Sequence, residues 1–196
     1  HTVDLVASAT ISVDNITADD IVNATESGSS INVTGTVGGD ATVGDTISID
    51  INGNTYAGAV GAGNTFTIAV PGIDLAADTT LDATVSGNDD AGNPFSASTT
   101  STHAVDLGAS ATISVDNITS DDIINAAESG GSINVTGSVG GDASVGDAIS
   151  IDVNGNTYAG TVSVGNTFSI AVPGSDLAAD TTVDATVSGS DSAGNP

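Results

Sequence analysis

The sequence predicts an all-β chain that folds into two tandem antiparallel β-sandwich domains of about seven strands each. The first observation is a repeat: residues 1–94 align with residues 103–196 without a gap, and about one position in five differs. A period of about 100 residues is the length of a whole small domain. The second observation is that apolar and polar residues alternate through each copy, which is typical of strands that bury one face.

The expected strands follow one another at short intervals. In the first copy we place them at residues 10–15, 31–37, 47–51, 56–60, 66–70, 81–85 and 95–97. Asn52-Gly53-Asn54 is a hairpin signal, Pro71-Gly72 ends a strand, and Leu75-Ala76-Ala77 adds one short helical turn at most. Seven strands with one apolar face each predict two sheets packed face to face.

The repeat also predicts the domain boundaries. We expect residues 1–9 to be a junction from a preceding repeat, 10–102 the first repeat, 103–111 an interdomain linker and 112–196 the second repeat. His103, the counterpart of His1, is then an exposed linker residue. Residues 95–102 form the last strand of the first repeat, and the second copy stops at Pro196 without a counterpart. We therefore expect an open sheet edge and an empty slot where Phe95 has no equivalent, and a natural chain that continues with a similar strand.

Charge limits the classes of partner. The chain holds 25 Asp and Glu but no Lys or Arg, so its formal net charge is −25. Binding to nucleic acid or to an anionic membrane surface rests on Lys and Arg, so we expect neither partner for this segment. The excess charge repels itself in the compact state, and cations must screen it.

Catalytic signatures are missing as well. There is no Cys, and the sequence contains no P-loop and no Gly-x-Ser-x-Gly nucleophile elbow. The single His of each copy has no Ser and Asp constellation close to it. We therefore expect a protein that is not an enzyme.

The acidic residues gather in loops. If alternate loops share one end of each sandwich, the exit end of the first domain faces the entry end of the second. Carboxylates with no basic partner repel one another, and Ca²⁺, which takes six to eight oxygen ligands, suits such a cluster better than Mg²⁺. At the junction, the predicted calcium ligands are Asp19, Asp20, Glu26 and Asp106 of the exit end and Asp142, Asp147, Asp191 and Asn195 of the entry end. Equivalent positions in the other copy add Asp121, Asp122, Glu128 and Asp89. Most loop acids in proteins are simply solvated, and we assign that role to the outward strand acids Asp14, Asp50 and Asp82.

Three blocks that recur in both copies carry a family likeness. Asp-Asp-Ile, Gly-Gly-Asp and Leu-Ala-Ala-Asp-Thr-Thr resemble the bacterial Ig-like extender repeats of giant RTX adhesins, and the likeness covers both copies. The resemblance implies an Ig-like sandwich at the bacterial cell surface, which spaces a ligand-binding tip away from the cell. It also implies that calcium at the domain junctions stiffens the array, with Asp19, Asp20 and Glu26, and Asp121, Asp122 and Glu128, in the acidic loops.

The resulting prediction is an extracellular, calcium-stiffened spacer whose partners are neighbouring repeats of the same chain. Two alternatives remain open. One is a filament or surface-layer subunit whose copies join through an open sheet edge or by strand donation. The other is a carbohydrate- or ice-binding module, which exposed aromatic residues or a flat outward array of Thr would favour.

Overall fold

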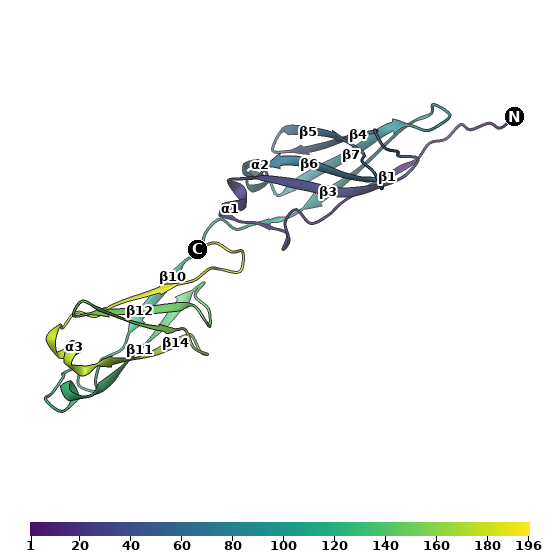
Figure 1. Ribbon diagram of the computed structural model, residues 1–196. Helices are drawn as coiled ribbons and strands as arrows, with labels where there is room; N and C mark the ends of the chain where they lie inside the picture. Colours follow the sequence, from purple (N-terminus) through teal and green to yellow (C-terminus); the bar gives the residue numbers. More distant parts are fainter. The chain divides into compact units, whose positions relative to one another are not determined.

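The computed structural model describes residues 1–196 and divides into two units, His1–Leu107 and Gly108–Pro196. Each unit is a sandwich of two antiparallel sheets (Figure 1). The predicted fold class is confirmed. We describe each unit by itself.

The first unit contains all seven expected strands. One sheet has the order β1-β3-β6, with β1 at Ala9–Val13, β3 at Ser30–Gly39 and β6 at Thr65–Pro71. The other has the order β5-β4-β7-β8, with β5 at Asn54–Ala59, β4 at Thr46–Ile51, β7 at Thr80–Asn88 and β8 at Pro94–Thr102. The inward positions close one core, in which Ile47, Ile49, Val70, Leu81 and Val85 are fully buried.

Two glycine-dependent features fix the shape of this sandwich. Asn52 and Gly53 both have positive φ, at 48° and 73°, which is the backbone of the type I′ turn that joins β4 to β5. Gly35 in β3 lies where a side chain would not fit, because a Cβ would come within 2.0 Å of the Ser12 carbonyl and 2.6 Å of the Phe66 ring.

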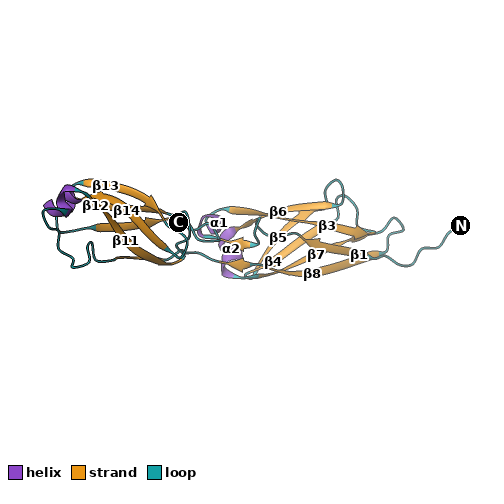
Figure 2. Ribbon diagram, turned by 90° about the horizontal axis from the view of Figure 1, so that it is seen from below, coloured by secondary structure: helices purple, strands orange, loops and turns teal.

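Four short elements complete the first unit, and two of them, α1 and α2, lie at the end away from the N-terminus (Figure 2). They are β2 at Ile21–Val22, α1 at Ala24–Ser27, α2 at Gly72–Ala77 and β9 at Ala104–Val105. β2 and β9 pair in parallel as a sheet of their own. Of these four elements, the sequence predicted only α2, as a single helical turn. β2 and β9 were not predicted, because a two-residue strand is too short to show an alternation of apolar and polar residues.

The expectation of an exposed His103 is wrong. The side chain is only 7% exposed, and its Nε2 lies 2.8 Å from the Leu75 carbonyl oxygen of α2. β8 ends at Thr102 and β9 begins at Ala104, so His103 is the single residue between the two strands. The first residues of the expected linker are therefore part of the first unit.

The second unit repeats this plan with fewer elements. One sheet has the order β10-β11-β14, at Ala111–Val115, Ser132–Gly141 and Thr167–Pro173. The other has the order β13-β12-β15, at Asn156–Thr161, Ala148–Val153 and Asp184–Ser188, so β15 is an edge strand. A 3₁₀ turn, η1, spans Glu128–Gly130, and α3 spans Gly174–Ala179. No helix of the chain has the length and apolar character needed to cross a bilayer.

Candidate metal sites at the ends of each unit

The Asp19–Asp20 loop is a tight turn held by its own carboxylates. Asp20 has a φ of 63°, in the left-handed region, and its Oδ1 accepts from the Ile16 N–H at 3.0 Å. Asp19 Oδ1 accepts from the Thr17 hydroxyl at 2.9 Å and from the Ile21 N–H at 3.2 Å. These two donors, the Thr17 hydroxyl first, hold the pKa of Asp19 below its ordinary value. The loop therefore presents two adjacent carboxylates on a fixed backbone.

Glu26 has a local role that the sequence analysis did not assign. The Asn23 N–H donates to Glu26 Oε2 at 3.0 Å, and the Glu26 N–H donates to Asn23 Oδ1 at 2.9 Å. This reciprocal pair is a capping box at the start of α1. The Asn-x-x-Glu spacing was the available signal. The capping box uses Oε2 of Glu26. The role of Glu26 as a calcium ligand stays a prediction.

Asp106 lies beside the same loop. The Ala104 N–H donates to the Asp20 carbonyl and the Asp106 N–H donates to the Val22 carbonyl, both at 3.0 Å. The parallel β2–β9 pair therefore brings the exit strand against the acidic loop. Asp19, Asp20, Glu26 and Asp106, the four predicted ligands of this end, thus flank one small sheet.

The equivalent loop of the second unit has the same geometry. Asp122 has a φ of 56° and accepts from the Ile118 N–H at 3.0 Å. Asp121 accepts from the Thr119 hydroxyl at 2.9 Å, which is the main cause that lowers its pKa. Glu128 Oε2 accepts from the Asn125 N–H at 2.9 Å. The hydrogen bonds that hold the acidic loop are therefore common to both repeats.

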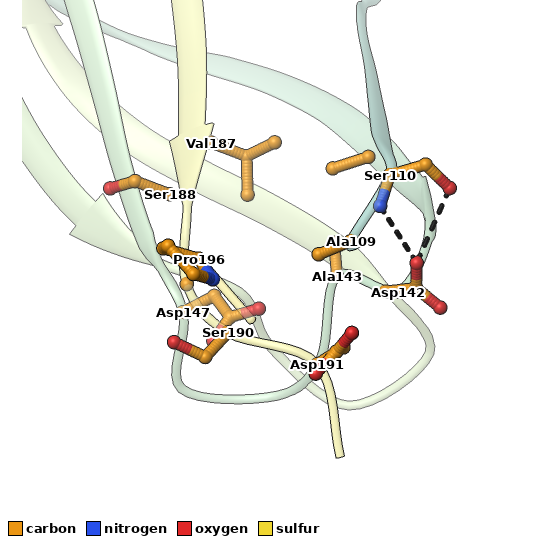
Figure 3. A pocket seen from close by; sticks show the side chains of 12 residues that line it. Ala109, Ser110, Asp142, Ala143, Asp147, Val187, Ser188, Ser190, Asp191 and Pro196 are labelled. Carbon is orange, nitrogen blue, oxygen red and sulfur yellow. Dashed lines mark hydrogen bonds between the residues drawn. The ribbon is translucent and has the colours of Figure 1, made fainter. Parts of the chain in front are cut away.

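At the opposite end of the second unit, Asp142, Asp147 and Asp191 line one pocket of about 320 Å³ (Figure 3). Asp142 Oδ2 accepts from the Ser110 N–H at 2.8 Å and from its hydroxyl at 3.3 Å. Asp147 Oδ2 accepts from the Ser144 N–H at 2.7 Å. The structure thus brings together three of the predicted entry-end acids around one hollow.

The fourth predicted entry-end ligand, Asn195, closes a turn with Asp191. Its N–H donates to Asp191 Oδ1 at 2.8 Å and its amide Nδ2 to Oδ2 at 2.8 Å. The side-chain amide is the main cause that lowers the pKa of Asp191. Asp89 and Asn93 repeat the arrangement in the first unit. Both carboxylate oxygens of these Asp residues thus shape the turn.

One polar cluster escaped the sequence analysis. The Tyr56 hydroxyl donates to Asp74 Oδ2, while Asn52 Nδ2 donates to Asp74 Oδ1 at 2.9 Å and Asn54 Nδ2 to Oδ2 at 3.2 Å. The Tyr56 hydroxyl is the first cause that holds the pKa of Asp74 below its usual range. Asp176 makes the same contacts in the second unit. The cluster ties the short helix to the β4–β5 hairpin.

The outward strand acids face one another. Asp50 in β4 is the register partner of Asp82 in β7, and like charges directly opposite each other destabilise a strand pair. Thr hydroxyls compensate, since Thr55 donates to Asp50 and Thr100 donates to Asp82 at 2.5 Å.

The chemistry of the end loops fits a hard cation. Their charged groups are carboxylates, which are potential metal ligands. No basic side chain competes with a metal ion for these carboxylates, because the chain has no Lys or Arg. No group of three or more Asp, Glu or His side chains in the structure has the geometry to hold a metal ion by itself. A calcium site built from both ends of a junction stays a prediction.

Comparisons with known proteins agree with the fold. No protein-family model matches the chain, and no curated protein does. A structure described as "Structural insight into host cell surface retention of a 1.5-MDa bacterial ice-binding adhesin" is 51% identical, with a TM-score of 0.89, over 96% of this chain and 61% of that chain. A second, "Ca2+-stabilized adhesin helps an Antarctic bacterium reach out and bind ice", is 47% identical, with a TM-score of 0.84, over 100% of this chain and 48% of that chain.

A third structure is a single bacterial immunoglobulin-like domain from the M. primoryensis ice-binding adhesin. It is 44% identical, with a TM-score of 0.48, over 51% of this chain and 97% of its own length. Our chain spans between about half and three fifths of the two longer structures.

Proposed function

The chain belongs to the bacterial immunoglobulin-like repeats of large cell-surface adhesins, and from this premise we propose that it is a calcium-stiffened extender segment. Its task is mechanical: it sets the distance between the bacterial surface and a binding module elsewhere in the protein. The carrying observation is the pair of acidic ends, repeated in both units, in a chain that has no basic residue.

Calcium is the cation that these ends would take. The proposed ligands are Asp19, Asp20, Glu26 and Asp106 on the exit side, with Asp142, Asp147 and Asp191 on the entry side of the next repeat. Two unit charges about 4 Å apart interact by about 1–4 kcal/mol at effective dielectrics between water and a protein surface. A divalent ion would convert that repulsion into attraction, and oxygen donors suit calcium. One relative is described as Ca²⁺-stabilised, which supports the proposal.

The chain around residue 108 is anchored closely on both sides. The Asp106 N–H is bound to β2 through the Val22 carbonyl, and the Ser110 N–H is bound to Asp142. Only residues 107–109 lie between these two anchors. The connection between the two anchored segments is therefore three residues long.

Small-angle X-ray scattering tests this function. In millimolar calcium the chain should scatter as one extended particle with a single maximum dimension. In chelator at the same ionic strength, the curve should require an ensemble of bent and extended forms. Identical curves in the two conditions would refute the stiffening role, and matched concentrations of NaCl control for simple screening.

A further inference from the structure

The turn between β4 and β5 consists of a dipeptide that is prone to spontaneous deamidation. A type I′ turn favours Asn-Gly because both central residues need positive φ, and Asn52 and Gly53 have φ values of 48° and 73°. The second unit repeats the turn, with 50° at Asn154 and 71° at Gly155. All four residues are exposed, so burial does not keep water or base away from them. Asn is also a residue that limits the lifetime of proteins.

The reaction joins the two residues of the turn. A base removes the proton of the Gly53 N–H, and the nitrogen attacks Cγ of Asn52. A bond forms between this nitrogen and Cγ, the bond from Cγ to Nδ2 breaks, and ammonia leaves. Water then opens the resulting cyclic imide at one of its two carbonyls, which gives aspartate or isoaspartate at position 52. The net change is the gain of one water and the loss of one ammonia.

The backbone of the folded turn holds the reacting atoms apart. In a type I′ turn, ψ of the first central residue is about +30°. At that angle, the Gly53 nitrogen and Cβ of Asn52 lie on nearly opposite sides of the Cα–C bond, whereas ring closure needs them on the same side. Rotation about this bond would disrupt the pairing of Ile51 with Asn54, which flank the turn. The reaction therefore requires the hairpin to open locally.

The side chain and the backbone of Asn52 are both tied to the α2 segment. Asn52 Nδ2 donates to Asp74 Oδ1 at 2.9 Å, and the Asn52 N–H donates to Asp78 Oδ2 at 3.2 Å. Asp74 is itself held in place, because its Oδ2 accepts from the Tyr56 hydroxyl and from Asn54 Nδ2 at 3.2 Å. The side-chain amide that would have to leave is thus the one that the carboxylate binds.

The charge of the carboxylate opposes the same reaction. The Tyr56 hydroxyl is the first cause that lowers the pKa of Asp74, so this carboxylate stays ionised in the alkaline range where base drives the attack. A nearby negative charge disfavours the formation of another one, here on the Gly53 nitrogen. Asp74 therefore acts on the geometry and on the electrostatics of the turn.

We propose that Asp74 and Asp176 are positioning residues that protect the Asn52-Gly53 and Asn154-Gly155 turns from deamidation, and that each turn becomes a modification site when its hairpin opens. Asn154 Nδ2 donates to Asp176 Oδ1 at 3.0 Å, and the Tyr158 hydroxyl donates to Oδ2. Either product at position 52 lacks the amide that donates to Asp74. Isoaspartate also lengthens the backbone of a turn that has only two residues. The modification would therefore release the hairpin from the short helix.

The test measures the deamidation rate at each Asn of the 196-residue chain during incubation in mildly alkaline buffer. Digestion with pepsin, under acidic conditions that stop the reaction, and mass spectrometry resolve the sites. In the native chain, both turns should react at least about tenfold more slowly than a capped peptide of residues 50–56. Asp74→Ala should accelerate the reaction at Asn52 by about tenfold, the factor expected for one charge-assisted hydrogen bond. Asn154 in the same molecules should keep its native rate, and Asp176→Ala should reverse the pattern.

A second variant separates protection from general stability. Gly35→Ala strains the first unit far from the turn and leaves the contacts of Asp74 in place. It is compared with Asp74→Ala at urea concentrations that unfold the same small fraction of the first unit. The proposal is overturned if Asn52 of the native chain reacts as fast as the peptide, or if Asp74→Ala does not change its rate. It is also overturned if Gly35→Ala accelerates the reaction at Asn52 as much as Asp74→Ala does.

Discussion

Replacing Asp19 and Asp20 together by Asn should remove most of the calcium-dependent stability of the first unit. The substitution changes charge with little change in shape. An amide oxygen can still accept from the Ile16 N–H and from the Thr17 hydroxyl, as the carboxylates do. Asn also tolerates the positive φ of residue 20. Any difference between the variant and the native chain in calcium therefore reports the lost charge.

The magnitude follows from ligand linkage. An ion that binds only the folded state stabilises it by about 2.7–4.1 kcal/mol at 100–1,000 times its dissociation constant. For a unit of about 100 residues, each kcal/mol moves the melting temperature by about 4–8 °C. Calcium should therefore raise the melting temperature of the native first unit by about 10–30 °C over chelator at matched ionic strength, and that of the variant by less than half as much.

Differential scanning calorimetry measures both quantities, and the matched control is the Asp50→Asn, Asp82→Asn variant. It removes the same number of charges from the facing pair of β4 and β7, away from the acidic loop. In chelator, the relief of self-repulsion favours both variants, whereas the loss of the charge-assisted hydrogen bonds that lower the pKa of Asp19 opposes it in the Asp19→Asn, Asp20→Asn variant. If both variants keep the full calcium effect, or lose it equally, the assignment of the junction to Asp19 and Asp20 is wrong.

Two further predictions concern stability. The Tyr56 hydroxyl holds the pKa of Asp74 below its ordinary 3.8, so the charged carboxylate contributes stability above that value and loses the contribution as pH falls through its folded pKa. Acid unfolding followed by circular dichroism should show less loss of stability below about pH 4 for Asp74→Asn than for the native chain, and an unchanged acid limb would contradict the contact. Gly35→Ala should destabilise by at least about 1–3 kcal/mol, because its Cβ would overlap a backbone carbonyl at 2.0 Å. Gly28→Ala, whose nearest atom is at 3.6 Å, should change the urea midpoint little; equal midpoints for the two variants would contradict the packing.

The strands could be predicted from the sequence because each buries one face. The alternation of Ile47, Ile49 and Ile51 with polar residues translates directly into the burial of β4. The repeat gave a second copy of every such pattern, and aliphatic exchanges between the copies preserved it. Period and repetition therefore identified both sheets.

The short elements were beyond such reasoning. β2 and β9 are two residues each and pair in parallel although more than 80 positions of sequence separate them. No local sequence pattern therefore predicts them. His103 was misplaced for the same reason: its burial depends on that pairing and on the Leu75 carbonyl. The loop acids were found from their composition, yet several also cap a helix or close a turn, and only Glu26 with its Asn23 partner left a readable signal.

The parallel pairing of β2 with β9 holds the last strand of the first unit against the acidic loop by backbone hydrogen bonds. A load on the chain beyond Val105 acts along β9, while the hydrogen bonds from Ala104 and Asp106 to the neighbouring strand run across it. Both bonds therefore share the load in shear and must break together, whereas a strand peeled from its end would release them one at a time. The buried His103 side chain, bound to Leu75, passes part of the force into the core. The hydrogen bonds that a load on the exit strand meets first thus lie next to the Asp19–Asp20 loop.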